Sequence, residues 1–270
     1  MKGSLMIERI NLRTPAALKA AVFDFDGTIS TLRCGWEQVM RPLMLECIAG
    51  TREVTPALEA EVDAYIDEST GIQTIYQMQW LAGRVVSAGG PERDPWVYKD
   101  EYNRRLMQRV EEKKRAVETG AARPEEYTVA GAAEFLRSLR GAGLELYLAS
   151  GTDDADVKKE AALLGVADLF TEIKGAPAHM AACSKEAVLG MLFEHRGFSG
   201  ESLLVVGDGK VEIALGKKHG AWALGAATDE VNRRGVNEVK RRRLIAAGAD
   251  AITGDFEDAD GIMGWMDINL

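Results

Sequence analysis

Two aspartates stand one residue apart at the end of an apolar run, in the stretch AVFDFDGT. Asp24 and Asp26 follow residues 21–23, which are typical of a buried strand, and Gly27 then introduces a turn. Two neighbouring carboxylates repel each other unless a positive charge lies between them. The pair therefore predicts either a plain Asp-Gly turn or a cation site at the carboxyl end of a strand, where open α/β sheets bind ligands.

Other polar groups follow two later strands. The segment LELYLA ends in Ser150 and Gly151, and a hydroxyl with backbone amides at a strand-to-helix turn can hold an anion. The segment SLLVVG ends before Asp208, and Glu212 follows one helical turn later on the same face. These carboxylates are hard oxygen ligands that suit Mg²⁺. The alternative interpretation of the first turn is a helix N-cap, and that of the second is an ordinary Asp-Gly turn.

A lysine stands at the start of the helix predicted over KEAVLGMLFEH. Lys185 opposes the helix dipole there, after Ser184 as the expected N-cap, so an anionic partner is indicated. Lys174 is the competing candidate. Lys185 is favoured because one helix, one turn and one strand separate it from Asp208, although either lysine could be a surface charge.

The elements that must position these groups lie in two regions with different patterns of predicted secondary structure. Residues 32–126 carry almost no strand signal, and helices are predicted over 35–47, 56–69, 72–86 and 96–118. From residue 127, helices alternate with strands near 144–149, 202–207, 221–226 and 250–255, with a short segment at 169–170 and helices near 229–247. The pattern predicts an α/β fold with a mostly parallel sheet covered on both faces. We expect core residues 1–31, an inserted helical cap over 32–126 that acts as a lid, and core residues 127–270.

Taken in order, the motifs DFDGT, SGT, a helix-opening lysine and GDGxxE resemble those of the haloacid dehalogenase superfamily. The helical insertion is similar to the cap of its phosphoglycolate phosphatase and β-phosphoglucomutase branch. The resemblance implies a Rossmann-like core and an Mg²⁺ cofactor. It also implies that Asp24 is the nucleophile that forms an aspartyl-phosphate, and that Asp26 is the general acid and then base, with its backbone carbonyl at the metal.

The resemblance assigns the remaining site residues as well. Ser150, Gly151 and Lys185 would hold the phosphoryl oxygens, and Asp208 with Glu212 would hold Mg²⁺. Glu212 departs from the family pattern, where an aspartate is common, and this puts its coordination geometry in question.

The expected activity is Mg²⁺-dependent hydrolysis of a small phosphorylated metabolite. The second aspartate disfavours dehalogenase chemistry. A phosphomutase shares the same core and remains an alternative. A phosphonate hydrolase would need a lysine in the cap, whereas Lys99, Lys113 and Lys114 lie in a charged helix and are expected to be solvated. A non-catalytic metal- or phosphate-binding module is disfavoured because the motif set is complete.

Substrate choice is expected to come from the cap and from the turn after DFDGT. Arg33 and Trp36 closely follow the first motif, and Gln73 and Thr74 stand near a helix start. All four are candidates for substrate contacts. The alternatives are that Trp36 packs in the cap core and that Gln73 and Thr74 serve helix capping.

Bulk composition restricts the partners. The 270 residues carry a net charge of −9, which argues against nonspecific nucleic-acid binding. The basic run 240–243 is therefore expected to be a solvated helix face. No apolar stretch is long enough for a signal peptide or a membrane span. Cys34, Cys47 and Cys183 are widely spaced, which indicates no zinc site or disulfide framework and fits a reducing cytoplasm. The oligomeric state stays open.

Overall fold

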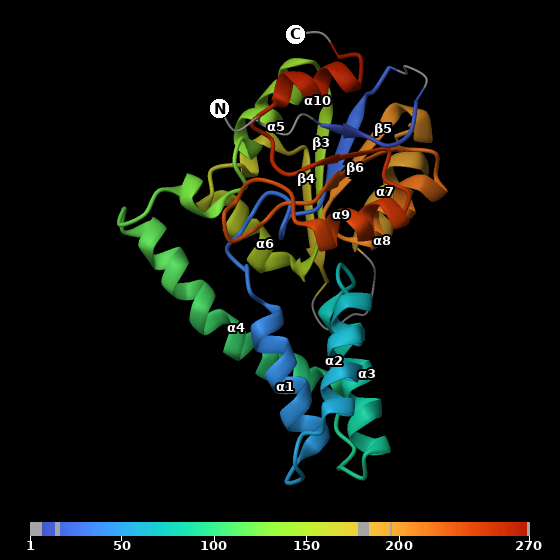
Figure 1. Cartoon of the computed structure of the whole chain (residues 1–270). Coiled ribbons are helices and arrows are strands. Elements are labelled where there is room, and N and C mark those ends of the chain that lie inside the picture. The colour runs from blue at the N-terminus through green and yellow to red at the C-terminus, as the bar shows by residue number, and fades with distance from the viewer. Residues whose placement is uncertain (1–6, 14–16, 178–183, 195, 269–270) are drawn as a thin grey trace.

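The core of the computed structural model is a seven-stranded sheet with helices on both faces (Figure 1). The structure describes residues 7–13, 17–177, 184–194 and 196–268. In spatial order the strands are β1 (Glu8–Arg9), β7 (Ala251–Thr253), β6 (Trp222–Ala226), β5 (Leu203–Gly207), β2 (Ala20–Phe23), β3 (Glu145–Asp153) and β4 (Glu172–Ala176). All neighbouring strands are parallel except β1, which pairs antiparallel with β7.

The central strands bury both of their faces. Successive side chains alternate, so Ala21 and Phe23 join one apolar cluster while Ala20 and Val22 join another. The first face is covered by α5 (Ala132–Gly141), α6 (Asp154–Leu163) and α10 (Ala259–Trp265). The opposite face is covered by α7 (Ser184–Glu194), α8 (Lys210–Lys218) and α9 (Glu238–Ala246). The predicted α/β fold with a parallel core sheet is confirmed.

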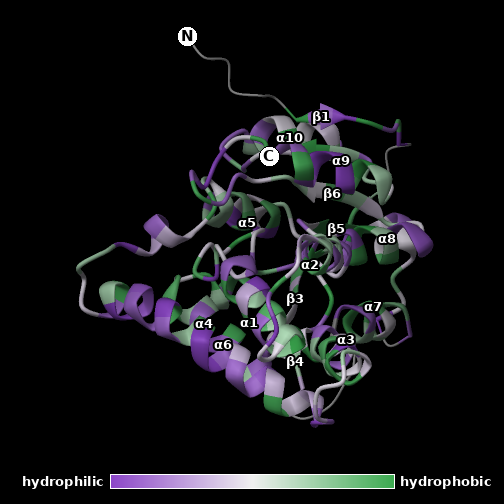
Figure 2. Cartoon of the chain, turned by 60° about the horizontal axis from the view of Figure 1, so that its bottom comes forward, coloured by the Kyte–Doolittle hydropathy of each residue, from purple (hydrophilic) through white to green (hydrophobic). Residues whose placement is uncertain are grey.

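A separate apolar cluster holds together the helices inserted after β2, which lie beyond one end of the sheet in Figure 1 and come forward in Figure 2. They are α1 (Glu37–Ala49), α2 (Pro56–Glu68), α3 (Thr74–Ser87) and α4 (Pro95–Glu118), and we call them the cap. Thr55 caps α2 by accepting a hydrogen bond from the Leu58 amide, and Pro56 fits the first turn because it has no N–H to satisfy. No helix in the described ranges is long and apolar enough to cross a membrane.

The two segments that connect the core to the cap run side by side. The Thr31 amide donates to the Tyr127 carbonyl over 2.9 Å, and the Val129 amide donates to the Ile29 carbonyl over the same distance. This pairing places the start of the cap beside its end, next to the aspartates that follow β2.

One local prediction was wrong. Residues 229–235 form turns rather than a helix, and both Arg233 and Gly235 have positive φ values that do not continue a right-handed helix. At the short segment expected near 169–170, Ala167–Leu169 form a 3₁₀ turn, and the edge strand β4 begins three residues later. β4 is an edge strand of mixed polarity, which weakens the sequence signal.

Candidate active site

Three buried carboxylates meet at the carboxyl ends of adjacent strands. Asp24 follows β2, Asp208 follows β5, and Glu212 lies in the first turn of α8. One oxygen of each lies within 4.8 Å of the others. Since Phe23 of β2 is paired in register with Val206 of β5, the two strand ends deliver their aspartates to one place. Burial raises the pKa of Asp24, and the nearby Lys185 ammonium opposes that rise.

Lys185 is the ammonium group at the centre of this cluster. Its Nζ lies 3.3 Å from Oδ2 of Asp24 and 2.7 Å from Oε2 of Glu212. Burial alone would lower the pKa of Lys185, but the Asp24 and Glu212 carboxylates raise it, so the group is a permanent cation. Lys174, the competing candidate, is partly exposed and pairs with Glu172. Helix α7 begins at Ser184, one residue before the expected start at Lys185, and the Ser184 side chain, expected as the N-cap, lies outside the described part of the chain.

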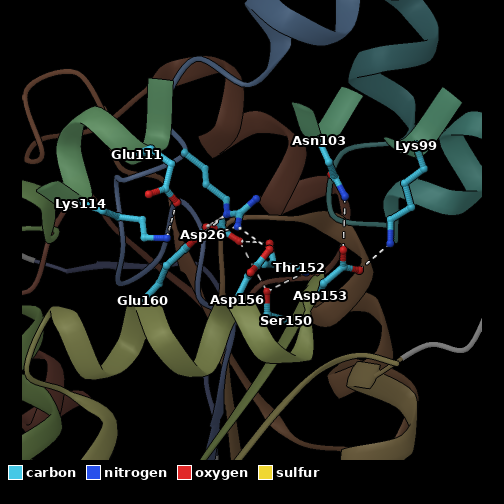
Figure 3. Close-up of polar contacts among 11 residues, drawn as sticks. Asp26, Lys99, Asn103, Glu111, Lys114, Ser150, Thr152, Asp153, Asp156 and Glu160 are labelled. Carbon is cyan, nitrogen blue, oxygen red and sulfur yellow. Dashed lines mark hydrogen bonds and ion pairs between the residues drawn. The ribbon is translucent and has the colours of Figure 1, made fainter. Parts of the chain in front are cut away.

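Asp26 has different surroundings from Asp24, and Figure 3 shows it beside Ser150 and Thr152. Its Oδ2 accepts a 2.7 Å hydrogen bond from the Thr152 hydroxyl and a longer one, 3.5 Å, from the Ser150 hydroxyl. Oδ1 is buried and has no hydrogen-bond partner among the described residues, and Arg33 Nε lies 3.8 Å away. Burial raises the pKa of Asp26 although Arg33 and Thr152 oppose it. Asp26 is thus oriented through one oxygen, while the other is able to carry a proton.

The acidic cluster fits a divalent cation. Asp24 and Asp208 each face an ammonium group through Oδ2 only, and their Oδ1 atoms accept no hydrogen bond from the described residues. These free carboxylate oxygens are the hard ligands that Mg²⁺ prefers. Glu212, in contrast, uses Oε2 for Lys185 and Oε1 for the Gly209 amide, so both its oxygens already have partners. Its direct ligation of a metal stays a prediction.

Lys240 lies inside this site, and the expectation of a solvated face is wrong for it. Its Nζ lies 2.6 Å from Oδ2 of Asp208 and also pairs with Glu230. Arg243, one turn along α9, donates to the Asp208 carbonyl over 3.2 Å. A signal was present in the sequence: Lys240 precedes the buried Leu244 by one helical turn and therefore shares its inner face.

A pocket separates the sheet end from the cap. On the core side it is lined by Asp24, Asp26, Ser150, Gly151, Lys185 and Asp208, so the structure brings these predicted site residues together. The cap side consists of Trp36, Thr70, Gly71, Ile72, Thr74, Gln77, Lys99, Tyr102, Asn103 and Leu106.

The candidate specificity residues fall into different environments. Trp36 and Thr74 line the pocket, and Trp36 also packs against the apolar cluster of the cap, so both of its interpretations hold. Gln73 lies at the N-cap position of α3, makes no capping hydrogen bond through its side chain, and faces a smaller apolar hollow beside the main pocket. Gln73 is therefore the one of these residues that the main pocket does not include.

The loop between α2 and α3 lies against the GDGxxE motif, close to Gly209 and Glu212. Gly71 has a φ of +89°, and a Cβ there would lie 3.4 Å from Cα of Gly209 and 3.5 Å from Oε2 of Glu212. Its carbonyl also accepts a 3.4 Å hydrogen bond from Lys185. The positive φ favours glycine here, whereas a Cβ would make only ordinary van der Waals contacts. The cap thus reaches Lys185 and Glu212 of the acidic cluster.

Arg33 lines the pocket, but its guanidinium is already engaged. Nη2 and Nε form two parallel hydrogen bonds, 2.7 and 3.2 Å long, with the fully buried carboxylate of Glu160. Nη2 also lies 3.7 Å from Asp156. This geometry favours a role for Arg33 in positioning Asp26 rather than in binding a second anionic group of the substrate.

The expectation that the α4 lysines are solvated is wrong for Lys99 and Lys113. Lys99 is 6% exposed, lines the pocket and forms a salt bridge with Oδ1 of Asp153. Asn103, one turn later, donates to Oδ2 of the same carboxylate over 3.3 Å, and Figure 3 shows both cap side chains pointing at Asp153. Lys113 is half-buried and donates to the Leu32 carbonyl over 2.7 Å.

Comparison with known proteins agrees with this geometry. A family model described as haloacid dehalogenase-like hydrolase matches residues 18–220. Similar solved structures include a predicted phosphoglycolate phosphatase from Haemophilus somnus, at 17% identity and a TM-score of 0.62, covering 92% of this chain and 99% of that one. A β-phosphoglucomutase from Clostridium difficile is 12% identical with a TM-score of 0.57, covering 93% of this chain and 97% of that one.

A predicted phosphatase from Clostridium acetobutylicum is 16% identical with a TM-score of 0.60, covering 92% of this chain and all of that one (100%). No match was found among curated proteins. At these identities the solved structures show a shared fold, while the family model spans most of the sequence. The chain therefore belongs to the haloacid dehalogenase-like hydrolases.

Proposed function

We propose that this protein is an Mg²⁺-dependent phosphomonoester hydrolase that forms an aspartyl-phosphate on Asp24. The observation that carries the proposal is the unequal environment of two aspartates one residue apart. Asp24 lies beside Lys185 in the acidic cluster, whereas Asp26 is oriented by Thr152 through Oδ2 and its Oδ1 has no hydrogen-bond partner among the described residues. Two carboxylates in different surroundings can serve as nucleophile and as general acid in the same reaction.

In the first step the Asp24 carboxylate attacks phosphorus, forming an acyl phosphate as the P–O bond to the alcohol breaks. Lys185, close to the attacking carboxylate, offsets the negative charge on the equatorial phosphoryl oxygens. Ser150 and Gly151 line the phosphate end of the pocket at the close of β3. When bound by Asp24, Asp208 and the Asp26 carbonyl, Mg²⁺ would neutralise further charge on the phosphoryl group.

Asp26 supplies the proton that the departing alkoxide needs. Its raised pKa favours the protonated form, and the unpartnered Oδ1 is the atom that can hold the proton. Once deprotonated, the same carboxylate takes a proton from the water that hydrolyses the acyl phosphate, returning Asp24 to its free form and releasing inorganic phosphate.

The test is phosphate release from a panel of small phosphomonoesters with and without Mg²⁺. We expect release that requires Mg²⁺ and is abolished by Asp24→Asn, with Asp100→Asn, an exposed position on α4, as the matched control. Acid-quenched enzyme should carry phosphate on the peptide that contains Asp24. Activity that survives in Asp24→Asn, or no release from any ester by folded protein, would contradict the proposal.

A phosphonate hydrolase is a second candidate, because a lysine of the cap, Lys99, lines the pocket. A Schiff base forms from a neutral amine, whereas Lys99 is held in a salt bridge with Asp153, and this favours the phosphatase. Borohydride treatment in the presence of an aldehyde-bearing phosphonate separates the two. The phosphatase predicts no adduct, and a reduced adduct on Lys99 would favour the phosphonate hydrolase.

A further inference from the structure

The cations that line the pocket already have carboxylate partners. Among the described lining residues these cations are Arg33, Lys99 and Lys185, and the structure pairs them with Glu160, Asp153 and the Asp24–Glu212 pair in turn. The acidic lining residues also face cations: Asp24 faces Lys185, Asp26 faces Arg33, Asp153 faces Lys99, and Asp208 and Glu230 both pair with Lys240, which is not itself a lining residue. Every cation on the described wall of the pocket therefore already has a carboxylate partner.

This charge balance matters for the part of the substrate that leaves. Under the proposed function, Lys185 serves the transferred phosphate, and Arg33 is fixed by Glu160 behind Asp26. Lys99 is then the cation nearest the leaving group, and its ammonium is neutralised by Asp153. On the described wall, a carboxylate or second phosphate on the leaving group would meet only cations that already have carboxylate partners, so the free-energy cost of removing it from water would not be offset.

The same wall offers complementary partners for hydroxyl groups. Asp153 accepts hydrogen bonds, and Lys99 and Asn103 donate them. Thr70, Thr74 and Gln77 add neutral polar groups on the cap side. The rings of Trp36 and Tyr102 provide apolar surface for the carbon skeleton. Aromatic, amide and carboxylate groups together suit an uncharged, hydroxyl-rich molecule.

We infer that the leaving group is an uncharged sugar or polyol, and that Lys99, Asn103 and Asp153 form the subsite that reads its hydroxyls and rejects acidic esters. This inference rests on the proposed phosphatase. It also disfavours a phosphomutase, because a phosphoryl group shuttled between two hydroxyls through the enzyme passes through a bisphosphorylated sugar, whose second dianion needs an unpaired cation.

The first experiment compares substrates that differ by one charged group. Sorbitol 6-phosphate is paired with 6-phosphogluconate, and glycerol 1-phosphate with 3-phosphoglycerate, so that a carboxylate replaces a hydroxymethyl group. We expect kcat/KM for the uncharged member to be higher by about tenfold or more, because no unpaired cation on the described wall offsets the desolvation of the added carboxylate. Equal or higher kcat/KM for the acidic members would overturn the inference.

The second experiment assigns the discrimination to the trio. Asp153→Asn frees the Lys99 ammonium for an anionic group and should raise kcat/KM for the acidic ester relative to the uncharged one. Lys99→Met leaves Asp153 without its cation and should lower that ratio below the wild-type value. Asp100→Asn, beside Lys99 but exposed, should leave the ratio unchanged. If neither Asp153→Asn nor Lys99→Met moves the ratio, the trio does not determine specificity.

Hydrolysis of p-nitrophenyl phosphate distinguishes the two levels of failure. Wild-type enzyme that cleaves this aryl ester but prefers acidic metabolites retains the proposed function and refutes the inference. Enzyme that cleaves neither the aryl ester nor any panel member refutes both. The wild-type substrate pairs test the inference even if a variant fails to fold.

Discussion

The Thr152 hydroxyl donates a 2.7 Å hydrogen bond to Oδ2 of Asp26, and the opposite oxygen of that carboxylate has no hydrogen-bond partner in the described structure. The hydroxyl comes from the end of β3 and the carboxylate from the turn after β2, so two neighbouring parallel strands orient the proposed acid. This arrangement predicts how the reaction depends on the leaving group.

Asp26→Asn should slow alkyl phosphate cleavage by about 10²–10⁴-fold, because the alkoxide then leaves without its proton. Release of p-nitrophenolate, which needs no proton, should fall much less in single-turnover measurements. Thr152→Val, which removes the orienting hydroxyl but keeps the acid, should show an intermediate loss for alkyl esters. Equal losses for both ester classes in Asp26→Asn would argue against its role as general acid.

The pH profile of the wild-type enzyme should carry the same signature. The proton donor is the protonated form of Asp26, so kcat/KM for alkyl phosphates should fall as the pH rises through its pKa. Since burial raises that pKa, the fall should occur at a higher pH than for an exposed aspartate. The aryl ester should show no such fall. A fall of the same size for the aryl ester in this range would contradict the assignment.

Metal binding should be visible in the stability of the protein. Burial raises the pKa values of Asp24, Asp26 and Glu230, so their stabilising contribution is present at low pH and is lost as the pH rises through the folded-state values. We expect Mg²⁺ to counter this loss, with an increment that grows from pH 5 to pH 8. At 100 times the dissociation constant the gain is about 2.7 kcal/mol, or roughly 5–10 °C in Tm.

Differential scanning calorimetry at several pH values tests this dependence on metal. Asp208→Asn, which removes a carboxylate from the acidic cluster, should lose most of the Mg²⁺ increment. An increment that is absent in the wild type, or that shrinks as the pH rises, would show that the cluster does not hold the metal.

The buried pair of Arg33 and Glu160 should behave as a unit in unfolding. Arg33→Met leaves the Glu160 carboxylate buried without its cation and should lower the free energy of unfolding by about 3–5 kcal/mol. The double variant Arg33→Met/Glu160→Leu should be less destabilised than the sum of the single variants, as measured by urea denaturation. Strict additivity would show that the two side chains do not interact energetically.

Lys240 should matter most when metal is absent. Lys240→Met leaves Asp208 and Glu230 without their shared ammonium, and the free energy of unfolding in EDTA should fall by about 3–5 kcal/mol. Arg242→Met, on the same helix but exposed, should change it by less than about 0.5 kcal/mol. Equal stabilities for the two variants would mean that Lys240 is no structural partner of the acidic site.

Much of the core could be predicted from sequence because it depends on local patterns. Apolar runs followed by Asp24, Ser150 and Asp208 predict strands, and the helices between them make the sheet parallel. Parallel strands end at the same edge, so the residues after them converge whatever the details of packing.

The contacts on the cap side of the pocket could not be predicted from the sequence in the same way. Helical periodicity shows which residues of α4 share a face, but not that this face carries Lys99 and Asn103 onto Asp153. The ionic partners of Arg33 and Lys240 are likewise distant in sequence, at Glu160 and Asp208. From sequence alone, a charged side chain is predicted to be solvated because its ionic partner is not known.

The sequence by itself determined most of the order of core strands and helices and the placement of Asp24, Ser150 and Asp208 at one edge of the sheet. Only the tertiary structure decided which of the surrounding charges are paired, which is the observation behind the proposed uncharged leaving group. The reason is that a strand ending is a local property of the chain, whereas the burial and neutralisation of a charge depend on segments that meet only when the cap packs against the core.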